Sequence, residues 1–352
     1  MFSTPSRTAV LTLAAFVVAA SCRPAAAQGD KLPELVTPKA AAAVERGLQF
    51  LAKQQLNDGS MAGNDGEAYP TAMTGLAGMA FLASGSTSTR GAYADQVRRC
   101  MLYLSKHQQP NGLIASGGEN GRPMYGHGFG LLFLASAYGM ETDPQRRKRI
   151  HEVIVNAIDL TVQGQSARGG WMYTPGSGDE GSVTVTQLQA LRACRNAGFD
   201  VPDSCVEGAI KYLEMCRTSD GGIRYSFGSG GDTRPAITAA AICCLYTAGE
   251  FDSPLAADCL EYSHSYFTNN SVSGIGHDYY AHFYASQAFF QAGEEYWQVH
   301  FPKLRDYLVA EQSANGSWGD GSWSSGVGAV YGTSMCCVIM QLPYRYLPIY
   351  QR

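Results

Sequence analysis

Charged residues are scarce in this sequence. Asp, Glu, Lys and Arg make up 16% of its 352 residues, against roughly 25% in a typical soluble domain. With 26 basic and 30 acidic residues the chain has no strong positive field, which argues against nucleic acid as a partner. The hydrophobic content of 45% excludes a disordered chain. The 40 glycines follow no triplet period, which excludes a collagen-like chain.

Long hydrophobic runs are also missing, except near the N-terminus. Elsewhere no stretch reaches the ~18 uncharged apolar residues of a membrane span, so we expect no span in the mature chain. Arg7 precedes an apolar run over residues 8–21, and residues 25–27 are Ala-Ala-Ala. This pattern predicts a signal peptide over residues 1–27 and export to the periplasm or the medium. Cys22 leaves a lipoprotein anchor as the alternative, which Ala19 disfavours because it stands where a lipobox normally has leucine.

The cysteines do not form a metal-binding pattern. No C-x-x-C pair occurs, so a structural zinc site of the finger type is not expected. The neighbours Cys243 and Cys244 lie in an apolar run, where cysteine acts as a small hydrophobic residue. Cys194 and Cys205 flank a short turn and could form a disulfide in an exported protein.

One phrase recurs along the chain: an aromatic–aliphatic pair, a glutamine or similar residue, and then Gly-x-apolar. Its most complete copy runs from Tyr307-Leu308 through Gln312 to Trp318. The glycines recur roughly every 50 residues with one double gap. The double gap predicts a degenerate copy near residue 268, which gives six repeats. The repeated glycines are Gly59, Gly112, Gly169, Gly221 and Gly316.

Each repeat pairs a charged helical stretch with an almost uncharged one. The uncharged stretches are 71–83, 127–139, 183–194, 236–248, 280–292 and 332–342, and Arg192 is their one charged residue. A helix that is apolar all round must be buried all round. We therefore predict an all-α fold, an (α/α)6 toroid of six hairpins and twelve helices with inner and outer rings. The toroid would span residues 44–352 after a linker over 28–43, and its fifth hairpin would be the least regular.

The phrase that ends at Trp318 resembles the QW repeat of squalene-hopene cyclase and related terpenoid cyclases. A second copy, from Arg46 to Gly59, matches the same pattern with Met61 in place of the tryptophan. The strings at 124–128 (MYGHG) and 182–186 (SVTVT) are typical of exported bacterial proteins of the prenyltransferase/squalene-oxidase-repeat group. The resemblance implies an α/α toroid that acts on or binds a polyprenyl or terpenoid ligand in its central cavity.

The chain departs from these families at their reactive groups. The Asp-x-Asp-Asp acid of the cyclases is absent, and its closest substitute is Asp179 with Glu180. That pair has a structural alternative, because a helix N-terminus attracts acidic residues. Protein prenyltransferases bind zinc through an Asp-x-Cys pair and a later histidine. The pair is absent from this chain, and His282 stands one position away from the place where that histidine would fall.

The starts of the inner helices should converge on one end of the central cavity. Asp278 and His282 stand four residues apart, hence on one helix face, and His127 opens the second inner helix. We interpret them as a carboxylate-oriented general acid or as ligands of a divalent metal such as zinc. The alternative is a capping aspartate and core histidines. Aromatic faces at the same end, which can stabilise a cation, would line the ligand: Tyr69, Tyr125, Tyr280 and Tyr331.

Three functions stay open at this point. The first is an enzyme that cyclises or transfers a polyprenyl or terpenoid substrate. The second is a non-catalytic toroid outside the cytoplasm that binds a lipid, another apolar small molecule or a protein partner. The third is an (α/α)6 glycosidase or polysaccharide lyase. A glycosidase needs two carboxylates facing a sugar, and the inner segments offer almost none.

Overall fold

The computed structural model describes residues 31–61, 69–117, 119–319, 323 and 326–351. The predicted signal peptide lies outside these residues and stays a prediction. Within them the structure has twelve α-helices and no β-strand, all in one compact unit that begins at Pro33. The odd-numbered helices are α1 (Pro38–Gln54), α3 (Ala94–Lys106), α5 (Pro144–Gln163), α7 (Asp203–Met215), α9 (Pro254–Asn269) and α11 (Glu294–Glu311). The even-numbered helices are α2 (Pro70–Ala83), α4 (Pro123–Tyr138), α6 (Gly181–Asn196), α8 (Pro235–Ala248), α10 (Asp278–Ala292) and α12 (Ala329–Gln341).

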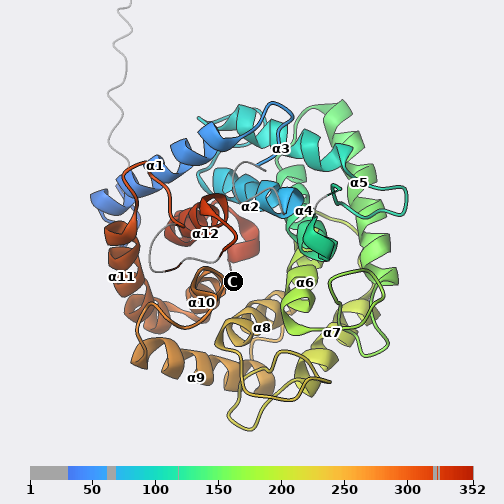
Figure 1. The fold of residues 1–352 in the computed structure, drawn as a ribbon, viewed down its shortest axis with the longest axis vertical. Coiled ribbons are helices and arrows are strands. Elements are labelled where there is room, and N and C mark those ends of the chain that lie inside the picture. Colours follow the sequence, from blue (N-terminus) through green and yellow to red (C-terminus); the bar gives the residue numbers. More distant parts are fainter. Residues whose placement is uncertain (1–30, 62–68, 118, 320–322, 324–325, 352) are drawn as a thin grey trace, which may run out of the picture. The chain divides into compact units, whose positions relative to one another are not determined.

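The helices of this unit form two concentric rings (Figure 1). Each even-numbered helix packs against the next, and α12 closes the inner ring by packing against α2. The odd-numbered helices lie outside them (Figure 1). This confirms the predicted all-α (α/α)6 toroid with its inner and outer rings.

Composition decides which ring a helix joins. Every residue of α2 is buried, as its lack of charge predicts, whereas α3 buries only one face that includes Val97 and Leu104. The small residues of the inner helices allow close contacts: a Cβ on Gly75 would lie 2.6 Å from the carbonyl oxygen of Phe129. The inner position predicted for residues 280–292 is confirmed, because α10 buries Phe283, Tyr284 and other residues on all sides.

The repeated glutamine ties four of the outer helices to the outer helix that follows. The side-chain amide of Gln165 donates to the carbonyl of Gly169 at 2.7 Å and to that of Cys205, in α7, at 2.8 Å. Gly169 has a φ of +97°, and a Cβ there would lie 2.0 Å from the carbonyl oxygen of Gly208 in α7. The close approach of α7 therefore requires a glycine at position 169. Three more glutamines donate in the same way to the carbonyl of the repeated glycine and to a carbonyl of the following outer helix. They are Gln55, Gln108 and Gln312.

Helix α1 begins earlier than the sequence interpretation placed it. Thr37 caps the helix by accepting a hydrogen bond from the backbone of Ala40 at 3.2 Å, and Pro38 occupies the first turn. The linker predicted over residues 28–43 is therefore wrong from Pro38 onward. A Thr-Pro start before an alanine run is a strong helix-initiation signal.

The cysteines described by the structure are nine buried free thiols. The disulfide considered between Cys194 and Cys205 is therefore not formed. In the part of the chain that the structure describes, no helix is long and apolar enough to cross a membrane.

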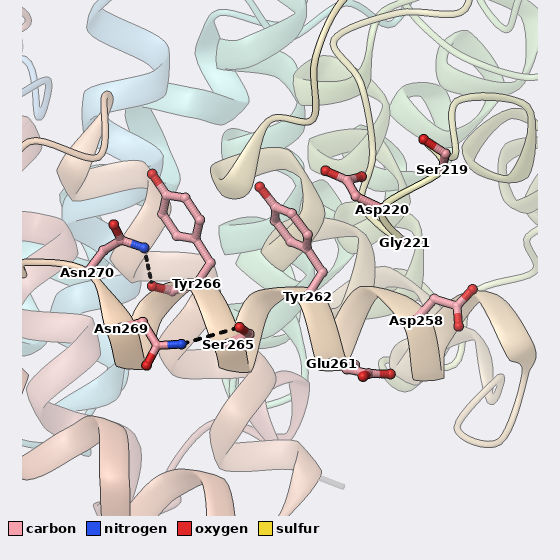
Figure 2. A pocket seen from close by; sticks show the side chains of 10 residues that line it. All are labelled: Ser219, Asp220, Gly221, Asp258, Glu261, Tyr262, Ser265, Tyr266, Asn269 and Asn270. Atoms are coloured by element: carbon pink, nitrogen blue, oxygen red, sulfur yellow. Dashed lines mark hydrogen bonds between the residues drawn. The ribbon is translucent and has the colours of Figure 1, made fainter.

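A cleft of about 570 Å³ lies between α9 and the turn that follows α7 (Figure 2). No inner helix contributes to its lining. The lining residues are Ser219, Asp220, Gly221, Asp258, Glu261, Tyr262, Ser265, Tyr266, Asn269 and Asn270.

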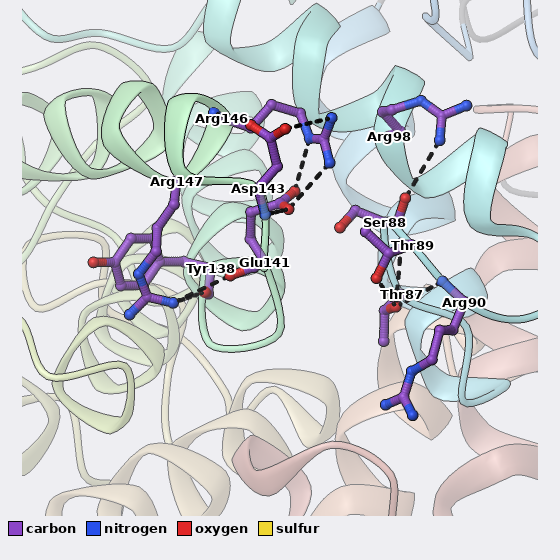
Figure 3. Close-up of polar contacts among 10 residues, drawn as sticks. All are labelled: Thr87, Ser88, Thr89, Arg90, Arg98, Tyr138, Glu141, Asp143, Arg146 and Arg147. Carbon is purple, nitrogen blue, oxygen red and sulfur yellow. Dashed lines mark hydrogen bonds and ion pairs between the residues drawn. The ribbon is translucent and has the colours of Figure 1, made fainter.

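The C-terminal end of the inner ring is held by polar loops and by the last residues of the chain. In the loop from α4 to α5, Glu141 forms an ion pair with Arg146 at 3.0 Å, and Asp143 caps α5 (Figure 3). The guanidinium of Arg147 lies 4.3 Å from the ring centre of Tyr138. After α12 the chain turns inward, and the 3-10 helix η4 (Pro348–Tyr350) packs against α6 and α10.

Candidate functional site

His127 is a structural residue. Its Nδ1 accepts a hydrogen bond from the backbone of Ile114 at 3.1 Å, its Nε2 lies 2.9 Å from Thr161 Oγ1, and the side chain is fully buried. In four of the other five repeats a threonine of the inner helix accepts the same backbone hydrogen bond from the repeated turn. These threonines are Thr74, Thr184, Thr238 and Thr333. His127 therefore replaces a threonine that fixes a turn.

His282 also packs in the core. Its Nε2–H donates to the carbonyl of Val272 at 2.8 Å. The ring is parallel to that of Trp323, with centroids 4.8 Å apart, and lies 5.7 Å from His300 of α11. Asp278, four residues earlier, is half-buried and accepts a hydrogen bond from the backbone of Ile275 at 2.9 Å. Asp278 and His282 thus have separate partners.

The possible metal ligands named from sequence are not brought together by the structure. Across the described residues no group of three His, Cys, Asp or Glu side chains is placed to hold a metal ion, so His127, Asp278 and His282 do not form a zinc centre. Burial lowers the pKa of His127 to about 4 and that of His282 to about 4. Both rings are therefore neutral near pH 7, as core histidines should be.

Asp179, the other acid proposed from sequence, belongs to a turn. Its carboxylate pairs with Arg168 at 2.9 Å and accepts a hydrogen bond from Ser166 at 2.9 Å. Both partners lie in the repeated turn after α5. The contacts of Asp179 therefore hold this turn together.

Glu180, the next residue, is the buried acid at the start of α6. It is fully buried and caps the helix, accepting hydrogen bonds from the backbone of Ser182 at 2.8 Å and from the backbone of Val183. Burial raises its pKa above the ordinary value, although these hydrogen bonds and the charge of Arg122 act in the opposite direction. Glu180 therefore holds a proton at higher pH than an exposed glutamate does.

A tyrosine of the neighbouring helix α4 and a tyrosine of α10 reach the start of α6. The hydroxyl of Ser182 donates to Glu180 at 2.8 Å, so the hydroxyl of Tyr125, 2.6 Å away, donates to Ser182. The hydroxyl of Tyr280 donates to the carbonyl of Ser182 at 3.2 Å. Tyr125 is half-buried, so the chain of hydrogen bonds leads from the buried carboxyl to a partly exposed phenol. We call the group of Tyr125, Glu180, Ser182 and Tyr280 the Glu180 cluster.

The remaining predicted aromatic residues lie beside this cluster or apart from it. Burial raises the pKa of Tyr280, and the neighbouring Tyr284, Tyr125, Glu180 and Tyr331 add to the effect, which puts Tyr331 of α12 at the same end. Tyr69 precedes α2, and its hydroxyl accepts a hydrogen bond from Asn120 at 3.1 Å.

Sequence reasoning missed a further layer of aromatic and charged residues around the cluster. The hydroxyls of Tyr173 and Tyr225 lie 2.5 Å apart, and the ring of Tyr173 is 5.9 Å from that of Tyr125. The guanidinium of Arg122 lies 4.7 Å from the ring centre of Tyr173. Tyr173 and Tyr225 each stand two residues after the apolar position of a repeated turn, a regularity that could have pointed to them.

A further buried carboxyl with a raised pKa, Glu119, was also missed. It accepts a hydrogen bond from the backbone of Thr71 at 3.0 Å and another from Ser116 Oγ at 3.2 Å. Its Oε2 is buried without a protein partner, and burial raises the pKa of the carboxyl. Glu119 has a left-handed φ of +56°, for which no sequence motif gave a signal.

A family model described as the prenyltransferase alpha-alpha toroid domain matches residues 127–342. The chain belongs to this family. The type II terpene cyclase MstE from Scytonema, in its apo form, has a TM-score of 0.58 at 14% identity and covers 88% of this chain and 100% of that chain. A variant of the same cyclase in complex with geranylgeranyl dihydroxybenzoate has a TM-score of 0.57 at 12% identity, covering 88% and 98%.

Toroids with sugar substrates are similar as well. An inactive variant of the α-1,6-mannanase GH76A of Salegentibacter sp. HEL1_6, in complex with α-1,6-mannotriose, has a TM-score of 0.61 at 10% identity, covering 86% of this chain and 98% of that chain. At these identities the similarity shows the fold alone. No curated protein matches the chain.

Proposed function

We propose that this protein is a terpenoid cyclase-like toroid that binds an isoprenoid-like ligand at the Glu180 cluster, with Glu180 as its proton donor. One observation carries the proposal: Glu180 is a fully buried acid with a raised pKa at the start of an inner helix. Perturbed carboxyls of this kind are typical of functional sites. The terpene cyclase complex with geranylgeranyl dihydroxybenzoate makes this ligand class the first to test.

The chemistry follows from the residues. Protonated Glu180 would give its proton to an alkene carbon of the ligand, whose π electrons form the new C–H bond and leave a tertiary cation. Aromatic faces such as that of Tyr280 would stabilise this cation by roughly 0.5–2 kcal/mol each. A neighbouring double bond would attack the cation and close a ring, and loss of a proton would restore an alkene. Ser182 and Tyr125 provide the hydrogen-bonded path by which Glu180 regains a proton.

A second candidate is a non-catalytic toroid that holds such a ligand outside the cytoplasm, where the predicted signal peptide would send it. It is favoured by the capping role of Glu180, whose oxygens already accept hydrogen bonds from the backbone of α6. A carboxylate engaged in this way can be purely structural.

Turnover and binding separate the two candidates. The purified protein is incubated with squalene and with geranylgeraniol, the products are analysed by gas chromatography with mass spectrometry, and bound ligand is measured by equilibrium dialysis. We expect a cyclised product that Glu180→Gln abolishes while binding and circular dichroism stay unchanged. Asp278→Asn serves as the matched carboxyl control and should retain turnover.

Two results would decide against catalysis. Binding without product would replace the cyclase proposal by the non-catalytic one. Neither binding nor product with both isoprenoids would overturn the proposed ligand class.

A further inference from the structure

The cleft along α9 has a floor of two stacked tyrosines. Tyr262 and Tyr266 stand one helical turn apart, so they share a face of α9. Their ring planes differ by 16° and their centroids lie 5.9 Å apart. Both side chains point to the same side of the helix (Figure 2). Burial raises the pKa of Tyr262 to about 12, with the charges of Asp220 and Tyr266 adding to the effect, so this phenol stays neutral.

The rim of the cleft is polar and largely uncharged. Seven of its ten lining residues carry no charge, and they include the amides of Asn269 and Asn270. Asn270 is held in place, since its amide donates to the carbonyl of Tyr266 at 2.9 Å and its own carbonyl accepts from Lys303 at 3.0 Å. Hydrogen-bonding groups thus stand beside the aromatic floor.

Two of the three carboxylates at the rim already have partners. Asp258 forms an ion pair with Arg217. Asp220 accepts hydrogen bonds from the hydroxyls of Thr218 and Thr233, each at 2.6 Å. The ion pair offsets the charge of Asp258, whereas Asp220 keeps its charge and has its acceptor positions occupied by the threonine hydroxyls. The seven uncharged lining residues and the two phenol rings favour an uncharged polar ligand over a cation.

We propose that this cleft binds a neutral oligosaccharide. The C–H face of a sugar ring packs against an aromatic ring, while its hydroxyls need donors and acceptors around the ring edge, and the cleft supplies both. Tyr262 and Tyr266 would each carry one sugar unit, and Glu261 and Asn269 would pair with hydroxyls. The volume of about 570 Å³ is within the range of small-molecule sites. The cleft is independent of the proposed function, because the Glu180 cluster shares no residue with it.

The test is binding of the full-length protein to an array of immobilised neutral oligosaccharides, followed by titration calorimetry with the best soluble glycan. Because a stacked aromatic contact contributes about 1 kcal/mol, Tyr262→Ala and Tyr266→Ala should each weaken binding about fivefold. Glu261→Gln should weaken binding without affecting the fold, which covers the case in which an alanine variant unfolds. Tyr346→Ala, at a tyrosine that is 54% exposed elsewhere on the surface, is the matched control.

Three outcomes would overturn the proposal. The first is no binding to any glycan of the array. The second is binding that all three cleft variants leave unchanged. The third is that no glycan binds but a trilysine peptide does, in a salt-sensitive way, and that Glu261→Gln abolishes the binding of the peptide. That result would make the cleft a cation site. None of these outcomes bears on isoprenoid binding, so the two proposals fail separately.

Discussion

The starts of α6 and α10 make a direct comparison, because both are inner-ring helices that begin beside an acidic residue. At α6, Glu180 is fully buried and caps the helix through two backbone amides. At α10, Asp278 is half-buried and accepts one hydrogen bond from Ile275 in the preceding loop. The sequence interpretation favoured α10, whereas the structure builds its buried polar cluster at α6.

The loops before the two helices explain the difference. The backbone of Glu180 donates to the carbonyl of Trp171 at 2.8 Å, and that of Gly181 donates to the carbonyl of Tyr225 at 2.7 Å. The loop before α10 has left-handed φ angles at Gly274, Gly276 and His277 and is mostly exposed. An acid at a helix start therefore becomes part of a buried cluster only where neighbouring turns cover it.

The largest expected effect comes from removing the buried acid. Glu180→Ala deletes the helix cap and leaves buried donors unpaired, which should lower the free energy of unfolding by about 3 kcal/mol. Asp278→Ala loses one hydrogen bond of a half-buried group and should cost about 0.5–1 kcal/mol. Urea denaturation of both variants gives the two numbers. Equal losses would remove the distinction between the two helix starts.

Acid should destabilise the protein through its buried histidines. Their ordinary pKa is 6.5 and the folded-state pKa of His127 and of His282 is about 4, so folding favours the neutral rings. Stability is then fully present above pH 6.5 and is lost as the pH falls toward 4, by about 2 kcal/mol per histidine at pH 5. The raised pKa values of Glu119 and Glu180 oppose this loss in part, because these carboxyls bind protons more readily in the folded state.

The measurement is urea denaturation between pH 7 and pH 5. His282→Phe keeps the ring packing and removes the titrating group, so its stability should depend less on pH than that of the unmodified protein. An identical pH dependence would show that His282 is not buried in its neutral form.

The ring could be predicted from sequence because its signal extends over whole helices. Residues 71–83 and 236–248 contain no charged side chain, and only an inner ring can bury such helices on every side. The position of α1 was misjudged at Pro38, where a local Thr-Pro signal was available.

The candidate site was harder to predict because it depends on which way single side chains point. An inner helix faces the outer ring as well as the centre, and His282 points outward, toward His300 of the outer helix α11. The role of His127 was present in the repeat, since Thr184 and Thr333 stand at the matching positions. Glu119, in a left-handed turn, required the structure itself.

The central claim is that the ligand site lies at the Glu180 cluster, and photoaffinity labelling tests it most directly. A geranylgeraniol that carries a diazirine is bound to the protein and irradiated, and the labelled residues are identified by tandem mass spectrometry, with unlabelled geranylgeraniol as competitor. We predict competed labels on Tyr125 of α4, Ser182 of α6 and Tyr280 of α10. Competed labels confined to the loop before Asp278, or to Tyr262 and Tyr266 in the α9 cleft, would contradict the account.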